Sequence, residues 1–226
     1  FFLKFRLQIT QWCYAQGLAR NMLVGSLFLV FASAANYIFV RIDQVMIGAM
    51  LGNMEVGLYA AAVKMVEVWY AIPVILCGSL FPAIVNAKKM DLPTYHRRLR
   101  MFFILLFVVG CLVSAFSVLV APFVVKMVLG VQYLPSIPIT QIYAWSGIGL
   151  FMGWGVYHYL LSEDKPKQIL YFYLFSMIVN ILLNFILIPV AGLTGAAWAT
   201  LIPYSLGPII FFCLKGMLPV RTVSTI

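Results

Sequence analysis

Long apolar runs recur along the chain, and short polar breaks separate them. A helix needs about 20 mostly apolar residues to cross a bilayer. The pattern predicts an all-α, polytopic membrane protein in which residues 20–217 form a six-helix transmembrane lobe. The predicted spans are residues 22–50, 57–86, 101–129, 138–161, 168–189 and 193–214.

The first three spans are longer than one crossing needs, at about 30 residues or roughly 45 Å. Helices of that length must tilt, kink or project beyond the bilayer. Pro73 and Pro82 provide kink points in the second span, because a proline inside a helix removes a backbone hydrogen bond.

The two ends of the chain differ from the spans. Leu3 to Thr10 alternates apolar and polar residues, a strand-like period of two. We expect residues 1–19 to form a cytoplasmic or interfacial segment and residues 218–226 to form a cytoplasmic tail. Residue 1 is Phe and the first methionine is Met22, so we expect the chain to be a fragment of a longer protein.

Lysine and arginine gather on one side of the predicted topology. The breaks at 51–56, 130–137 and 190–192, which share the other side, contain none. Cytoplasmic loops carry an excess of Lys and Arg, so both termini are predicted to be cytoplasmic. The basic residues on that side are Lys4, Arg6, Arg20, Lys88, Lys89, Arg97, Arg98, Arg100, Lys165, Lys167, Lys215 and Arg221.

The densest of these basic segments runs from Lys88 to Arg100. A nucleic-acid or regulatory-lipid site is one interpretation of such a run. The other is that it anchors a long cytoplasmic loop on the positive side of the membrane, which explains it fully. We therefore expect membrane lipids, and no nucleic acid, among the partners.

Composition excludes a soluble globular protein. Only 9% of the 226 residues are charged and the mean hydropathy is +1.04, whereas soluble domains have about 25% charged residues. The net charge of +9 then follows from topology. No metal or cofactor is expected, because the cysteines and histidines lack ligand or redox spacing. They are Cys13, Cys77, Cys111, Cys213, His96 and His158.

Four formal charges lie within the first two predicted spans, at Arg41, Asp43, Lys64 and Glu67. Each costs about 2.5 kcal/mol or more in hydrocarbon, so they require a water-filled cavity or ion pairs. Arg41 and Asp43 face opposite sides of one helix, whereas Lys64 and Glu67, at i and i+3, are close enough to pair. The two adjacent spans could also bring Asp43 against Lys64.

Two interpretations of these charges remain open. In the first, they form buried ion pairs that fix helix register. In the second, Arg41 and Lys64 supply spare positive charge to a hydrated cavity and bind an anion, because Arg suits phosphate through its fork and Lys supplies a point charge. Asp43 and Glu67 would then couple transport or balance charge. Possible cavity-lining residues are Asn36, Tyr37, Gln44 and Tyr70.

Gly149 and Gly153 stand four residues apart in the fourth span. Small residues at this spacing let helices approach closely in lipid. The spacing predicts a packing face, with a dimer contact as the alternative.

Three stretches resemble the polysaccharide (O-antigen) flippase family of the multidrug/oligosaccharidyl-lipid/polysaccharide exporter superfamily. They are R-I-D-Q-V-M-I-G-A-M-L-G (residues 41–52), E-V-G-L-Y-A-A-A-V-K (residues 55–64) and the segment Trp69–Ile84. A later stretch, I-P-V-A-G-L-T-G-A-A-W-A-T (residues 188–200), is similar to a helix start found across the superfamily.

The resemblance implies a fold of two six-helix lobes around a central cavity, of which this chain matches the C-terminal half. It implies flipping of polyprenyl-diphosphate-linked oligosaccharide, by alternating access, across a bacterial inner membrane for O-antigen or other surface polysaccharide, including lipopolysaccharide. Arg41 and Lys64 would face the diphosphate or acidic sugars. The partners would be the lipid-linked oligosaccharide, membrane lipids and the missing N-terminal lobe.

Two other functions stay open. A cation-coupled multidrug exporter of the same superfamily would use Asp43 and Glu67 as coupling carboxylates. A glycan-assembly membrane enzyme is disfavoured, because the predicted outer loops are short and offer little beyond Glu55, Gln132 and Tyr133. We therefore expect a transporter and not an enzyme.

Overall fold

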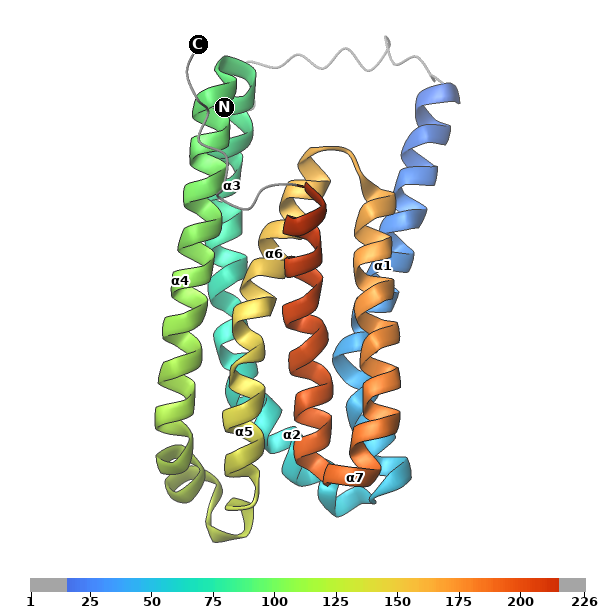
Figure 1. The fold of residues 1–226 in the computed structure, drawn as a ribbon. Coiled ribbons are helices and arrows are strands. Elements are labelled where there is room, and N and C mark those ends of the chain that lie inside the picture. Colours follow the sequence, from blue (N-terminus) through green and yellow to red (C-terminus); the bar gives the residue numbers. More distant parts are fainter. Residues whose placement is uncertain (1–15, 216–226) are drawn as a thin grey trace, which may run out of the picture.

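The computed structural model describes residues 16–215, which are helical apart from short turns and single connecting residues (Figure 1). The predicted tail at 218–226, and residues 1–15 of the predicted N-terminal segment, lie outside the described residues. The helices are α1 (Gln16–Met50), α2 (Asn53–Glu67), η3 (Val68–Tyr70), α3 (Ala71–Met90), α4 (Leu92–Val124), η4 (Val125–Leu129), η5 (Val131–Tyr133), α5 (Ser136–Ala144), α6 (Ser146–Ser162) and α7 (Pro166–Lys215).

Four helical segments of the described chain are long and apolar enough to cross a membrane. The predicted count of six is not supported by this criterion. Residues 138–161 are divided at Trp145 between α5 and α6, and residues 168–189 and 193–214 both lie in α7. The four segments are Met22–Met50, Asn53–Met90, Leu92–Leu129 and Pro166–Leu214.

The second segment changes its helix type before its first proline. α2 passes through the 3₁₀ turn η3 and continues as α3, in which Pro73 is buried and Pro82 lies inside the helix. A proline has no N–H for the carbonyl four residues earlier, and for Pro73 that carbonyl belongs to Trp69, in the middle of η3. The change in helix type therefore coincides with the first predicted kink point.

The basic run that was predicted to be a loop is helical. α3 continues to Met90 and α4 begins at Leu92, so a single extended residue, Asp91, separates them. The Asp91 carboxylate accepts a hydrogen bond from the Thr94 backbone N–H at 3.0 Å, as an N-cap does. Hydrogen bonds from Thr94 hold the pKa of Asp91 below its usual value. The basic residues thus extend two helices, and the helix that contains most of the predicted span at 101–129 begins at Leu92.

α7 reverses direction near its middle. Gly192 has a φ of 58° and a ψ of −135°, a backbone conformation that residues other than glycine rarely adopt. Figure 1 shows the two arms of α7 side by side on either side of this point. They are in close contact, because Asn180 Nδ2 donates to the Ala199 carbonyl across 3.2 Å. An added Cβ at Gly195 would lie 2.2 Å from the Leu187 carbonyl oxygen.

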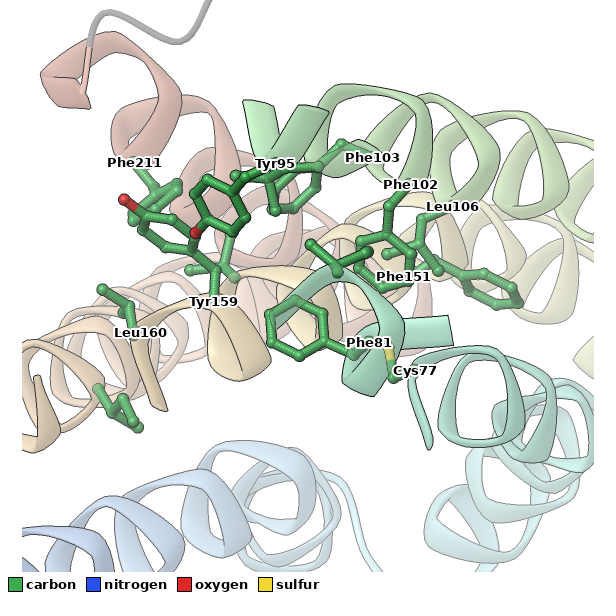
Figure 2. Close-up of a cluster of buried hydrophobic side chains, with 14 of the residues drawn as sticks. Cys77, Phe81, Tyr95, Phe102, Phe103, Leu106, Phe151, Tyr159, Leu160 and Phe211 are labelled. Atoms are coloured by element: carbon green, nitrogen blue, oxygen red, sulfur yellow. The ribbon is translucent and has the colours of Figure 1, made fainter. Parts of the chain in front are cut away.

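The buried core of the described residues consists of two clusters. The larger one is rich in aromatic rings and joins α3, α4, α6 and the second arm of α7, with Ala32 of α1 and Ile169 of the first arm of α7 (Figure 2). The smaller one joins α1, α2, α5 and α7, and it includes Ile47, Tyr59, Tyr143 and Ile188. The second cluster contains Tyr59, which binds Asp43, so it is the one that positions the candidate site.

The predicted packing face on α6 is confirmed at Gly149, and its partner is α7 of the same chain. An added Cβ at Gly149 would lie 2.2 Å from the Tyr204 carbonyl oxygen, whereas one at Gly153 would lie 3.8 Å from the Phe172 ring. The close contact between α6 and α7 at Gly149 is therefore possible only because glycine has no side chain.

We expect Gly149→Ala to lower the free energy of unfolding by about 3 kcal/mol, because backbone must move to admit the methyl group. Thermal unfolding of the purified protein in detergent measures this. Gly57→Ala is the matched control, since Gly57 is helical and has open space around it. Equal stability of the Gly149 variant and the control would contradict the close contact.

Candidate functional site

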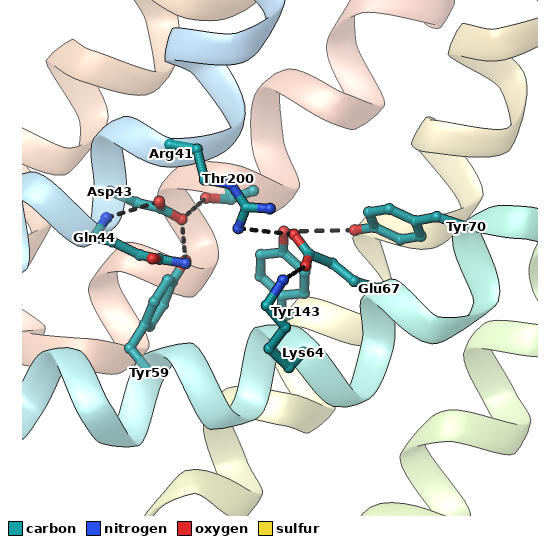
Figure 3. A network of polar contacts seen from close by, with 9 residues as sticks. All are labelled: Arg41, Asp43, Gln44, Tyr59, Lys64, Glu67, Tyr70, Tyr143 and Thr200. Atoms are coloured by element: carbon teal, nitrogen blue, oxygen red, sulfur yellow. Dashed lines mark hydrogen bonds and ion pairs between the residues drawn. The ribbon is translucent and has the colours of Figure 1, made fainter.

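Asp43 lies in a seam between α1, α2 and the second arm of α7, and only 1% of it is exposed. Its carboxylate accepts hydrogen bonds from the Tyr59 hydroxyl at 2.6 Å and the Gln44 backbone N–H at 2.8 Å. The Thr200 hydroxyl is also in reach, at 3.4 Å (Figure 3). These donors satisfy an anion that hydrocarbon alone would not tolerate.

The prediction that Asp43 could contact Lys64 is wrong. Among the described residues no Lys or Arg forms a salt bridge with Asp43. Tyr59 and Lys64 are five residues apart on α2, which places them about 140° apart around the helix. Because the Tyr59 hydroxyl binds Asp43, Lys64 points away from that seam.

A chain of buried polar groups continues from Asp43 into α7. Thr200 is within hydrogen-bond distance of Asn180 Nδ2, at 3.4 Å. Asn184 Nδ2 in turn donates to Asn180 Oδ1 at 3.1 Å. Asn184 Oδ1 is buried and has no hydrogen-bond partner within the described part of the chain. This series of hydrogen-bonded groups therefore ends at an acceptor that can still accept a hydrogen bond.

Sequence reasoning missed this buried chain. The signal was present, because Asn180 and Asn184 are spaced i, i+4 inside an apolar run, so both amides lie on one helix face. A search for formal charges does not find these two amides, and it does not find the neutral donors Tyr59 and Thr200 either.

The other three charges form one cluster between α1 and α2, which we call the charged cluster (Arg41, Lys64 and Glu67). Arg41 Nη1 lies 3.1 Å from Glu67 Oε1, and Lys64 Nζ lies 2.8 Å from Glu67 Oε2. The predicted i, i+3 pair is thereby confirmed. Two cations share one carboxylate, so the charged cluster has a formal charge of +1.

The charged cluster is not sealed. The Arg41 side chain is 34% exposed and that of Lys64 is 67% exposed, whereas that of Glu67 is 13% exposed. A cation that is both paired and accessible retains donors for a second anion, since guanidinium has five N–H groups and ammonium has three. The cluster can therefore accept an additional anionic group without losing Glu67.

A cavity of about 370 Å³ lies beside this region and is lined by α1, η3, α3, α6 and both arms of α7. Of the predicted lining residues, Asn36 and Tyr70 contribute to it. Tyr37 and Gln44 do not: Tyr37 is 70% exposed on α1 and Gln44 lies next to Asp43. Tyr70 connects the cavity with the smaller core cluster, because its hydroxyl is 3.5 Å from that of Tyr143, a member of that cluster (Figure 3).

Two solved structures have a similar fold. One is described as the outward-facing conformation of a multidrug resistance MATE family transporter of the MOP superfamily, with a TM-score of 0.71 and 14% identity. The other is a MOP superfamily transporter from Pyrococcus furiosus whose binding pocket is described as having reverse polarity, with a TM-score of 0.66 and 15% identity. Each match covers 86% of this chain and 44% of the transporter, so the chain spans less than half of their length. At these identities the likeness shows the fold alone.

No match to this chain is found among curated proteins. A model of the family described as "Polysaccharide biosynthesis protein" matches residues 2–138, which is more than half of the 226 residues. The matched part includes the charged cluster and Asp43. The chain is therefore a multi-pass membrane protein and belongs to the polysaccharide biosynthesis protein family.

Proposed function

We propose that this chain is the C-terminal lobe of a transporter that moves polyprenyl-diphosphate-linked oligosaccharides to the outer leaflet of a bacterial inner membrane. The transported oligosaccharide would be used to build O-antigen or another surface polysaccharide. The lobe would work by alternating access together with an N-terminal lobe. Family membership supports the polysaccharide context, and the fold supports transport.

The observation that carries the proposal is the positive charge of the accessible charged cluster; the buried carboxylate of Asp43, which brings the sum of the four charges to zero, is held in its own seam by neutral donors. Glu67 neutralises one of the two cations of the charged cluster, and the accessible side chains of Arg41 and Lys64 leave one positive charge for a diphosphate. The same surplus disfavours an organic cation as cargo at this position, which argues against the multidrug alternative.

The contacts of the two carboxylates support a different role for each. Glu67 contacts both cations and would balance their charge. Asp43 has hydrogen-bond donors but no ion-pair partner among the described residues, so a proton or monovalent cation would find an unneutralised acceptor there. We assign coupling to Asp43.

The six predicted crossings are part of this proposal. The reversal of α7 at Gly192 divides it into two arms, and α5 with α6 covers residues 136–162 except Trp145. With both termini in the cytoplasm, the basic ends of α3 and α4 would face the cytoplasm, as would the turn between α6 and α7.

Disruption of the gene is expected to remove surface polysaccharide and to leave lipid-linked oligosaccharide in the inner leaflet. Labelling of the glycan by an impermeant lectin in right-side-out vesicles measures this, and the wild-type gene should restore it. Unchanged polysaccharide together with new drug sensitivity would contradict the proposal and favour a multidrug exporter. Glycan joining or cleavage by the purified protein would favour an enzyme.

A further inference from the structure

The cavity beside the charged cluster, which we call the aromatic cavity, has a wall rich in aromatic rings. None of its lining residues carries a formal charge. Its volume of about 370 Å³ is within the range of pockets that hold small ligands, about 300–1,000 Å³. Six of its rings are Phe39, Tyr70, Trp154, Tyr157, Tyr173 and Tyr204.

Several polar groups in the aromatic cavity have no protein partner. Within the described residues, the side chains of Asn36, Trp154, Tyr157, Tyr173 and Tyr204 take part in none of the side-chain hydrogen bonds that the structure forms. They are not fully buried polar atoms, so the cavity leaves them accessible. Inside a membrane such groups require water or a polar ligand, because hydrocarbon provides no partner.

We infer that the aromatic cavity binds an uncharged sugar ring, the one joined directly to the diphosphate of the cargo. A pyranose has an apolar C–H face that packs on an aromatic ring and a rim of hydroxyl groups that need donors and acceptors. The cavity offers both kinds of surface and no ionic group. The inference rests on the proposed function.

The position of the aromatic cavity relative to the charged cluster fixes which sugar it would take. Tyr70, in the cavity wall, is one helical turn beyond Glu67, and Val40, also in the wall, precedes Arg41. A diphosphate held by the charged cluster would therefore place its first sugar at the mouth of the aromatic cavity.

The other ligands of the same membrane fit less well. A prenyl chain would leave the amide of Asn36 and the tyrosine hydroxyls without partners, at a cost for each group. The neighbouring groove around Phe175, Ile210 and Leu214 has a mostly apolar wall and suits a lipid chain better. An organic cation would gain cation–π contacts with these rings, but the wall of the aromatic cavity contains no carboxylate to neutralise it.

Trp154 is the residue best placed to support the ring. Its indole stacks near His158, with ring centroids 6.0 Å apart, and meets Tyr157 edge-on at 6.2 Å. These neighbours fix the orientation of the indole before any ligand arrives. Its loss should therefore remove sugar binding and leave diphosphate binding intact.

The test compares two probes of equal charge by calorimetry on the full-length natural protein in lipid nanodiscs: the terminal methyl ester of geranyl diphosphate, and geranyl-diphosphoglucose, in which one uncharged hexose replaces the methyl group. In the wild-type protein the sugar-bearing probe should bind about tenfold more tightly, which corresponds to about 1.4 kcal/mol. Trp154→Ala should remove this ratio, and Trp154→Phe should retain most of it. Asn36→Leu should reduce it in part.

Trp198→Ala is the matched control, because Trp198 is 48% exposed on α7 and does not line the aromatic cavity. It should keep the tenfold ratio. Unchanged affinity of Trp154→Ala for the methyl ester shows that the variant is folded. Equal binding of both probes by the wild-type protein, or equal weakening of both by Trp154→Ala, overturns the sugar site alone. Failure of both probes to bind the wild-type protein overturns the proposed function and the sugar site together.

Discussion

Replacement of Asp43 by Asn is expected to lower the transport rate by about 100-fold, which corresponds to about 2.7 kcal/mol in the barrier. Asn is nearly the same shape, and its carbonyl oxygen can still accept from Tyr59 and Thr200, although its NH2 group replaces the oxygen that accepts from the Gln44 N–H. The seam should therefore remain packed while the negative charge is lost. Initial rates in proteoliposomes, under an imposed proton or sodium gradient, measure the effect.

Asp91→Asn is the matched control for that variant. Asp91 is exposed and caps α4, and Asn caps a helix as well as Asp does, so transport should be unchanged. Wild-type rates in Asp43→Asn, with the same dependence on the gradient, would show that the charge in the seam plays no part in coupling.

Loss of both Arg41 and Lys64 is expected to abolish surface polysaccharide. The double Ala variant changes the charged cluster from +1 to −1, because Glu67 remains alone. A charged hydrogen bond contributes about 1.5–3 kcal/mol, so two such bonds to a diphosphate account for a loss of binding far above 100-fold. Complementation of a disrupted strain, with membrane abundance measured alongside, gives the result.

Lys126→Ala is the matched control for the double variant. Lys126 is basic and exposed in η4, apart from the charged cluster. Its removal should leave polysaccharide at the wild-type level. Full complementation by the double Ala variant at normal abundance would contradict the assignment of Arg41 and Lys64 to the cargo.

The sequence predicted the helical nature of the chain and the unusual charges, because long apolar runs and isolated charges are strong signals. The Lys64–Glu67 pair was predictable because both residues lie on one helix, where spacing fixes their separation. The Arg41–Glu67 contact was not predicted, and the Asp43–Lys64 contact was predicted wrongly. Both depend on how far α1 and α2 rotate about their axes, which tertiary packing decides.

The predicted helix boundaries differ from those of the structure for another reason. The polar residues at the ends of α3 and α4 have the composition of a loop, but a long helix can extend beyond the apolar region. Asp91, followed by Leu, Pro and Thr, was the local sign of a helix start at Leu92. Of the wall of the aromatic cavity, only Asn36 and Tyr70 were predicted to line a cavity. The rest was out of reach, since the wall brings Asn36, Tyr70, Trp154 and Tyr204 together from four separate parts of the chain.

The most direct test of the central claim is the dissociation constant of geranyl diphosphate for the wild-type protein and for variants that differ in the charge at residues 41 and 67. If the charged cluster holds the cargo diphosphate, Arg41→Ala should weaken binding about tenfold or more. Glu67→Gln, which raises the cluster charge from +1 to +2, should tighten it. Identical constants in all three proteins, or weaker binding in Glu67→Gln, would contradict the claim and leave these side chains as ion pairs that hold α1 against α2.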